Sequence, residues 1–141
     1  MSVLTDDVRA ALTAGHHVHL TTINPDGRPQ ISLIWVGLDG DDIVSGHMGM
    51  RQKLRNVQRD PRVALSLETG GTNAMGLDEY LVIEATARVT EGGAADLLQR
   101  LAGTYLGPGI KFPPIDDPPP GYVLRMTPTR VGGVGPWTAG A

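Results

Sequence analysis

Cysteine is absent from the sequence, and this absence excludes disulfide bonds, zinc sites with thiolate ligands and cysteine nucleophiles. Aromatic residues are scarce at 4%, which disfavours a single-strand nucleic-acid binder because such proteins stack bases on aromatic side chains. The formal net charge of -3 argues against a surface that is basic throughout. No apolar run approaches the roughly twenty residues of a membrane-spanning helix, and the first residues lack the charge pattern of a signal peptide. We therefore expect a soluble, cytoplasmic protein that neither spans a membrane nor binds nucleic acid.

Glycine and proline are by contrast frequent, with 19 and 11 residues in a chain of 141, and they predict many turns and short strands. A chain of this length suits one domain with a real core, so we expect residues 1–141 to form a single unit. Two segments show no periodicity. One is a proline-rich loop at residues 107–121, which we expect to be flexible, and the other is a glycine-rich C-terminal tail at residues 131–141.

Alternation of apolar and polar residues predicts six strands, which cover residues 17–23, 29–36, 43–45, 62–68, 80–89 and 122–127. Apolar residues at helical spacing predict three helices, near residues 3–14, 51–59 and 91–105. The first two strands are joined by the turn signal Asn24-Pro25-Asp26-Gly27, and a second turn is predicted at residues 38–41. Because the first turn leaves no room for a crossover helix, a Rossmann domain is disfavoured. The order favours a mainly β (α+β) fold, an antiparallel six-stranded barrel with peripheral helices.

The second predicted helix carries an unusual charge distribution. Five of the 12 basic residues fall within residues 51–62, and Arg51, Lys53 and Arg55 stand at the N-terminal end of the helix with no acid before Asp60. Exposed N–H groups and the macrodipole make a helix N-terminus positive, so cations are mildly unfavourable there. A bound phosphate would resolve this conflict, because N–H groups and basic side chains can converge on it. A solvated basic face is the alternative, and the helix alone does not decide between the two.

The remaining polar side chains predict neither a catalytic triad nor a metal site. The four histidines, His16, His17, His19 and His47, have no neighbouring cysteine and no zinc-binding HExxH spacing. No serine lies in a nucleophile elbow. His47, directly ahead of the basic helix, is better placed to hydrogen-bond a ligand held there.

Three segments together resemble the pyridoxamine 5'-phosphate oxidase-like superfamily of split β-barrel flavin and deazaflavin proteins. They are the hairpin TTINPDGRPQ at residues 21–30, the strand SLIWV at residues 32–36 and the segment RQKLRNVQRDPR at residues 51–62. The last segment, an Arg-x-Lys-x-Arg-Asn helix closed by Asp-Pro, is similar to the reductase branch that uses coenzyme F420, a deazaflavin hydride carrier of actinobacteria. The FMN-binding branch shares the layout, so FMN is the alternative cofactor. The resemblance covers nearly the whole chain and implies a split barrel.

The resemblance also implies which residues bind the cofactor. The phosphate would lie on the basic helix, held by Arg51, Lys53 and Arg55, with Asn56 supporting the helix. The ring edge would lie along main-chain groups of the second strand, at Ser32, Leu33, Ile34 and Trp35. Burial statistics make plain barrel core an equally good interpretation of Trp35. Members of the family are typically homodimers with each cofactor at the subunit interface, which would let an aromatic residue such as Trp137 or Tyr105 close the site from the partner chain.

The activity that the resemblance implies is hydride transfer from reduced F420 to a small, hydrophobic, electron-poor acceptor such as an enone, a quinone or a tetrapyrrole. A protein of this kind holds the ring, excludes water and orients the acceptor, so we expect no obligatory catalytic side chain. The chain lacks the additional C-terminal segment with which true pyridoxamine phosphate oxidases bind substrate, which argues against the pyridoxal-forming reaction. The alternatives are an FMN-binding protein of the same layout and a non-catalytic module that binds or stores flavin or F420. A cavity lined by the loop at residues 107–121 would favour the enzyme, and a ring sealed by Trp137 or Phe112 would favour the binding module.

Overall fold

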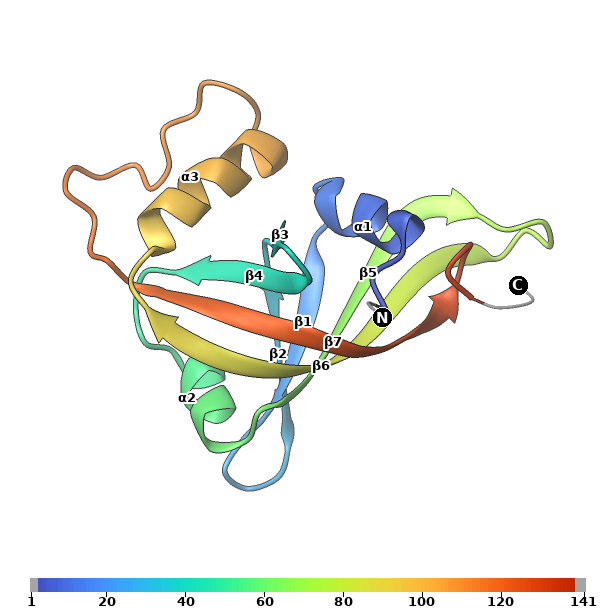
Figure 1. Ribbon diagram of the computed structural model, residues 1–141, viewed down its shortest axis with the longest axis horizontal. Coiled ribbons are helices and arrows are strands. Elements are labelled where there is room, and N and C mark those ends of the chain that lie inside the picture. The colour runs from blue at the N-terminus through green and yellow to red at the C-terminus, as the bar shows by residue number, and fades with distance from the viewer. Residues whose placement is uncertain (1–2, 139–141) are drawn as a thin grey trace.

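The computed structural model describes residues 3–138, and its strands form one antiparallel sheet that curves strongly around a core (Figure 1). The order of strands across the sheet is β2-β1-β5-β6-β7-β4-β3. The strands are β1 (Val18–Ile23), β2 (Pro29–Ile34), β3 (Gly37–Asp39), β4 (Asp42–His47), β5 (Arg62–Thr72), β6 (Asp78–Glu91) and β7 (Tyr122–Val134). The helices are α1 (Asp6–Thr13), α2 (Gln52–Arg59) and α3 (Ala94–Tyr105). The fold is thus mainly β with peripheral helices, consistent with the predicted split barrel.

Residues 3–138 form seven strands where the sequence predicted six. The additional strand, β3, pairs Gly37 with Val44 and Leu38 with Ile43, and it takes up part of the turn predicted at residues 38–41. A strand of three residues is too short to display an alternating pattern, which is why the prediction missed it. Because β3 and β2 end the sheet on opposite sides, the chain crosses between the two ends of the sheet within the short link Trp35-Val36.

The last strand, β7, is longer than predicted. It continues to Val134 and stays paired with β6, so residues 131–134 belong to the sheet and not to a tail. Glycine is depleted in strands, and Gly132-Gly133 concealed this part of the strand in the sequence. Gly133 has a φ of 105°, and a Cβ atom there would lie 2.2 Å from the carbonyl oxygen of Tyr80, so the contact with β6 requires glycine. Residues 139–141 of the predicted tail lie outside the described residues.

The predicted hairpin of β1 and β2 is confirmed, and its turn sets the register of both strands. The Asn24 N–H donates to the Arg28 carbonyl at 2.8 Å, and the Gly27 N–H donates to the Asn24 carbonyl at 2.8 Å. Gly27 has a φ of 86°, which glycine adopts at no steric cost. The hairpin packs against α2, which stands at its side in Figure 1.

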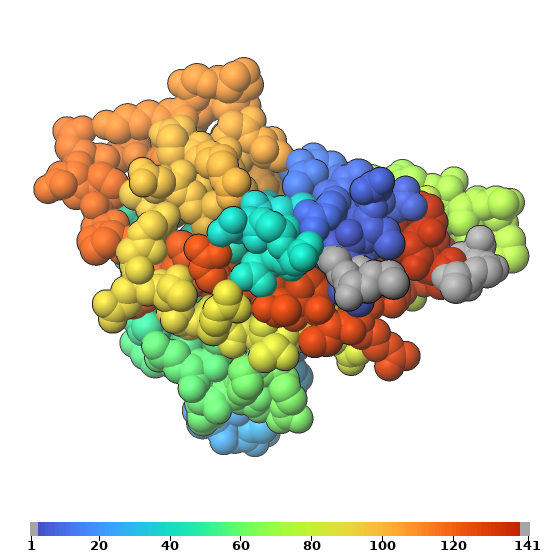
Figure 2. Space-filling model, viewed as in Figure 1, coloured from blue at the N-terminus to red at the C-terminus, as the bar shows by residue number. Residues whose placement is uncertain are grey.

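Helix α2 is anchored in the core by one face only. Leu54 and Val57 are buried among the barrel side chains, and the helix ends at Arg59 because proline at position 61 disfavours helical geometry at Asp60. On the opposite side of the barrel, α3 packs against β4 and β7, and the loop that follows it stands out beside it on the surface (Figure 2). Helix α2 therefore lies against β1 and β6, whereas α3 lies against β4 and β7.

Candidate functional site

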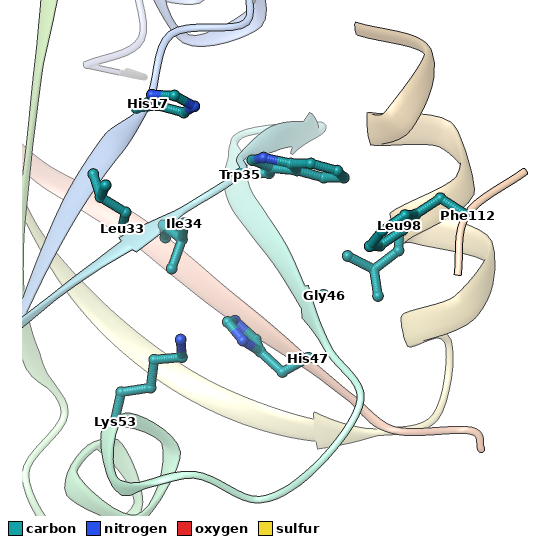
Figure 3. Close-up of a pocket in the computed structure, with 9 residues that line it drawn as sticks. All are labelled: His17, Leu33, Ile34, Trp35, Gly46, His47, Lys53, Leu98 and Phe112. Atoms are coloured by element: carbon teal, nitrogen blue, oxygen red, sulfur yellow. The ribbon is translucent and has the colours of Figure 1, made fainter. Parts of the chain in front are cut away.

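A pocket of about 320 Å³ lies between β2, β4, α2 and α3 (Figure 3). Its lining residues come from six separate parts of the chain: His17, Leu33, Ile34, Trp35, Gly46, His47, Lys53, Leu98 and Phe112. Strand β4 approaches α3 closely at Gly46, where a Cβ atom would lie 3.0 Å from the Leu98 Cγ. The volume matches the lower end of small-molecule pockets, which hold roughly 300–1,000 Å³.

One end of the pocket is polar and is formed by Lys53 and His47. Burial lowers the pKa of Lys53, and the positive charge of Arg51 lowers it further. Burial, with the charge of Lys53 as a second cause, lowers the pKa of His47 to about 4, so its imidazole is neutral at neutral pH. The Nε2 atom of His47 lies 2.8 Å from the hydroxyl oxygen of Ser45, which is also buried. This end of the pocket therefore combines an ammonium group with a fixed, uncharged imidazole.

Three cations at the start of α2 have no acidic partner. Within the part of the chain that the structure describes, Arg51, Lys53 and Arg55 form no ion pair, whereas Arg62 pairs with Asp60 at 2.8 Å and Arg59 donates to the Ile23 carbonyl. The first hydrogen bonds of the helix are those that the N–H groups of Leu54 and Arg55 donate to the Arg51 carbonyl. The helical N–H groups that precede Leu54 therefore have no intrahelical acceptor. The positive end of α2 thus carries additional, uncompensated positive charge.

Asn56 ties this helix to the hairpin. It is fully buried, and its Nδ2 donates to the Thr22 hydroxyl at 3.0 Å and to the Asn24 Oδ1 at 2.9 Å. Its Oδ1 accepts from Gln52 at 2.8 Å and from Arg59 at 3.4 Å. With its amide occupied in this way, Asn56 holds the middle of α2 against β1 and the hairpin turn through contacts within the chain.

The other end of the pocket is aromatic. The Trp35 ring stacks on Tyr105, with centroids 5.1 Å apart and planes 9° apart, and meets Phe112 with centroids 5.1 Å apart at 49°. Tyr105 accepts a hydrogen bond from the Val36 N–H at 3.1 Å and donates one to the His16 carbonyl at 2.9 Å. Burial raises the pKa of Tyr105, which keeps the phenol protonated as a donor.

The free edge of β2 borders the pocket. In an antiparallel pair, hydrogen-bonded and non-hydrogen-bonded positions alternate. Asn24 and Arg28 form a hydrogen-bonded pair, so by this alternation the main-chain groups of Ile31 and Leu33 point away from β1. Strand β1 is the only strand that pairs with β2 in the described sheet, so these groups lie on a free edge. Leu33 lines the pocket, so polar main-chain groups of the outer edge stand next to it.

Of the residues predicted to bind a cofactor, the structure brings five together around the pocket: Leu33, Ile34, Trp35, His47 and Lys53. The side chains of Arg51 and Arg55 are exposed on α2, outside the pocket lining. The hydroxyl of Ser32 is buried and has no hydrogen-bond partner among the described residues. Trp137 packs against the main core cluster, away from the pocket lining, and its indole N–H is likewise buried without a partner.

Four lining residues, His17, Gly46, Leu98 and Phe112, were not among the predicted cofactor residues. Leu98 and Gly46 carry no signal in the sequence, because an apolar helix position and a strand glycine are common in any core. Phe112 does carry one, since it is the single phenylalanine of the chain and falls in a long loop. In the described residues no group of three or more histidine, aspartate or glutamate side chains is arranged to hold a metal ion. No helix among residues 3–138 is long and apolar enough to cross a membrane.

The chain belongs to the pyridoxamine 5'-phosphate oxidase family, whose family model matches residues 4–135. This match covers the sheet, all three helices and the pocket, and it agrees with the split barrel that the strand order describes.

Several proteins of known structure have a fold similar to that of this chain. An F420 reductase is 26% identical over 88% of this chain and 94% of its own, with a TM-score of 0.71. A conserved hypothetical protein of Mycobacterium tuberculosis, Rv2991, is 25% identical over 90% of this chain and 81% of its own, also with a TM-score of 0.71. The heme storage protein HutZ of Vibrio cholerae is 16% identical over 94% of this chain and 95% of its own, with a TM-score of 0.63, and at that identity it shares the fold alone.

Proposed function

We propose that this protein binds coenzyme F420 and transfers a hydride from the reduced deazaflavin to a small, hydrophobic, electron-poor acceptor of the enone, quinone or tetrapyrrole type. The observation that carries the proposal is the start of α2, where three cations have no acidic partner within residues 3–138. One of them, Lys53, lines a pocket bordered by the free edge of β2. The similarity to an F420 reductase supports the choice of F420 over FMN.

The residues present suit a phosphate-bearing, planar cofactor. Arg51, Lys53 and Arg55, together with the first N–H groups of α2, offer charge-assisted hydrogen bonds to a phosphate. Lys53 both belongs to this group and lines the pocket, so it connects the phosphate site with the ring site. A phosphate would also relieve the repulsion among the cations, which otherwise have no counter-charge in the described part of the chain.

The ring site is formed by the end of β2. Leu33, Ile34 and Trp35 supply apolar contact, and the outward main-chain groups next to Leu33 supply hydrogen bonds to polar ring atoms. The unpaired hydroxyl of Ser32 lies on the same strand, and a buried polar group without a partner is costly unless a ligand satisfies it. His47, held neutral beside Lys53, is a hydrogen-bonding group that adds no further charge.

The chemistry comes from the cofactor, because reduced F420 would supply the hydride, and the reduced acceptor would take up its proton from bulk solvent after the hydride transfer. The side chains hold the ring and exclude water, and none of them is required as a nucleophile. Phe112, from the loop at residues 107–121, lines a cavity instead of filling it, which leaves room for an acceptor and favours an enzyme over a sealed binding module.

The proposal includes a homodimer with the cofactor at the interface. The apolar side chains of Ile31 and Leu33 are 64% and 57% exposed on β2, at the end of the sheet. An open edge strand with apolar side chains is a surface that proteins usually cover. Trp137 lies outside the pocket of its own chain, so its predicted contact with the cofactor would be made across the interface.

A side-by-side titration of the purified protein with F420 and FMN, followed by fluorescence, tests the cofactor. Tight binding of F420 with weak binding of FMN supports the proposal, and reduced F420 is then mixed with enone and quinone acceptors to test for turnover. The opposite preference assigns the protein to FMN. Binding of F420 without oxidation by any acceptor leaves a non-catalytic binding or storage module, and binding of neither cofactor refutes the proposal.

A further inference from the structure

The wall of the pocket opposite Lys53 is made by Trp35 and Phe112, and contacts outside the pocket hold both residues in place. Trp35 is backed by the parallel ring of Tyr105 at 5.1 Å. Tyr105 is itself fixed by two hydrogen bonds, one from the Val36 N–H and one to the His16 carbonyl, on the two segments that flank β1 and β2. The indole therefore presents a rigid flat face to the pocket.

Phe112 is held in place from α3 by a single side chain. The Gln99 amide donates from Nε2 to the Ile110 carbonyl at 2.8 Å and accepts at Oε1 from the Phe112 N–H at 3.0 Å. These two bonds bracket Lys111 and fix the loop just where its only aromatic ring meets Trp35. Gln99 does not line the pocket, so its effect on the pocket passes through Phe112.

The two rings contact each other and form one continuous aromatic wall of the pocket. Their centroids are 5.1 Å apart and their planes meet at 49°, and Leu98 lies beside Phe112 in Figure 3. Among the described residues no lysine, arginine, aspartate or glutamate lines this end, where His17 stacks on Tyr105 with centroids 6.5 Å apart. Lys53 and the uncharged imidazole of His47 occupy the other end. Flat conjugated molecules gain from contact with fixed aromatic faces beyond the area that they bury, and non-planar rings of similar size do not.

We infer that Phe112 is the specificity-determining residue of this pocket, selecting acceptors with a flat conjugated ring system, and that Gln99 is the positioning residue that holds it there. The inference rests on the proposed function only in treating the bound molecule as a hydride acceptor. The aromatic wall itself does not depend on that function. Among the enones, quinones and tetrapyrroles of the proposed function, it favours benzo-fused quinones and aryl enones over alicyclic enones.

The test measures binding of two probes by calorimetry, with the full chain both free and saturated with oxidised F420. Menadione is a flat bicyclic quinone, and 2-cyclohexen-1-one is a puckered enone of smaller size. Phe112→Ala and Phe112→Leu should weaken menadione binding about five- to ten-fold and change cyclohexenone binding by less than about two-fold. Phe112→Tyr keeps the flat ring and should keep the preference for menadione.

Gln99→Leu removes both bonds to the loop without touching the pocket, and it should lower the preference for menadione about as much as Phe112→Leu does. The matched control is Ile115→Ala, which removes an exposed apolar side chain of the same loop and should leave the preference unchanged. General destabilisation does not alter a ratio of affinities, so the ratio separates positioning from simple folding defects. If the ratio of menadione affinity to cyclohexenone affinity is unchanged in the Phe112 variants, the inference is wrong. If the ratio is unchanged only in Gln99→Leu, Phe112 still selects the acceptor but Gln99 does not position it.

The outcomes also separate this inference from the proposed function. If F420 does not bind but menadione affinity depends on Phe112, the proposed cofactor is wrong and the aromatic wall stands. If F420 binds and the menadione preference ignores Phe112, the aromatic wall is wrong and the cofactor stands.

Discussion

The hydroxyl oxygen of Ser45 and the Nε2 atom of His47 lie 2.8 Å apart on one face of β4, both buried at the polar end of the pocket. Lys53 lies close enough to act on His47 electrostatically, and its charge adds to the burial that lowers the histidine pKa to about 4. A buried imidazole between a hydroxyl and an ammonium group is stable only while it is neutral. The pair therefore makes the stability of the fold depend on pH.

We predict that the free energy of unfolding falls as the pH is lowered from about 6.5 to about 4. In this window the unfolded chain protonates His47 at its ordinary pKa while the folded chain cannot, so the unfolded state binds more protons and acid favours it. The stabilisation is fully present above pH 6.5, and the loss amounts to roughly 3 kcal/mol at most. Urea unfolding at several pH values measures it.

The comparison variant is His47→Gln, whose stability should change less across the same window. Asp60, whose pKa the Arg62 hydrogen bond lowers to about 2, contributes its own acid dependence, but equally in both proteins. His19→Gln, at an exposed position on β1, controls for the loss of a histidine. If the free energy of unfolding depends on pH equally in the native protein and in His47→Gln, then His47 is not the source of the pH dependence.

The double variant Lys53→Ala with Arg55→Ala should bind F420 at least about ten-fold more weakly, because charge-assisted contacts to the phosphate are lost. Fluorescence titration measures the affinity, and the loss should shrink at high salt, where exposed charges are screened. Arg130→Ala removes one exposed cation from β7 and controls for the loss of a positive charge far from the start of α2; it should leave the affinity unchanged. Unchanged affinity in the double variant would leave the start of α2 as a solvated basic face.

Replacing Asn56 with alanine should destabilise the fold by about 2–3 kcal/mol. The variant leaves the Thr22 hydroxyl and the Asn24 amide short of their partner, and unpaired buried polar groups cost about 1–3 kcal/mol each. Asn56→Asp should be no better, because a carboxylate cannot donate to either oxygen. Thermal and urea unfolding give the values, with Gln58→Ala on the exposed side of α2 as the control. A loss no larger than that of Gln58→Ala would contradict the role of Asn56 as the link between helix and hairpin.

Much of this architecture is encoded locally, and the sequence predicted those parts. The hairpin followed from the turn signal at residues 24–27, and the limits of α2 followed from a proline and from Leu54 and Val57 at helical spacing. The three-residue strand β3 and the glycine-containing end of β7 were missed, because both are formed by pairing with neighbours and not by their own propensity. In the same way, the sequence pointed to Lys53 and Trp35 by type, but only the fold brings Leu98 and Phe112 to them.

The partners of the buried polar groups mark the limit of sequence reasoning even more sharply. Asn56 was expected to support its helix, but nothing in the sequence selects Thr22 and Asn24 as its acceptors. Likewise, Gln99 is one of several polar residues on α3, and only the path of the loop makes it the residue that holds Phe112. Such contacts depend on side chains that lie far apart in the sequence, so they appear only once the chain is folded.

The open edge of β2 leads to the last prediction, which concerns the dimer. Ile31 is 64% exposed at the end of the sheet, and its main-chain groups face away from β1. If a second copy covers this edge, Ile31→Glu buries a charge without a partner and should convert the dimer to a monomer. Size-exclusion chromatography with light scattering measures the mass of the particle.

Ile115→Glu is the matched control, because it introduces the same charge at an exposed isoleucine of the loop after α3 and should leave the mass unchanged. The monomeric variant should also bind F420 more weakly than the native protein, since a cofactor at the interface loses the contacts of the second chain. A native protein that is already a monomer contradicts the interface altogether. A monomeric Ile31→Glu variant with full affinity for F420 would mean that each chain holds its cofactor alone, and that Trp137 takes no part in the site.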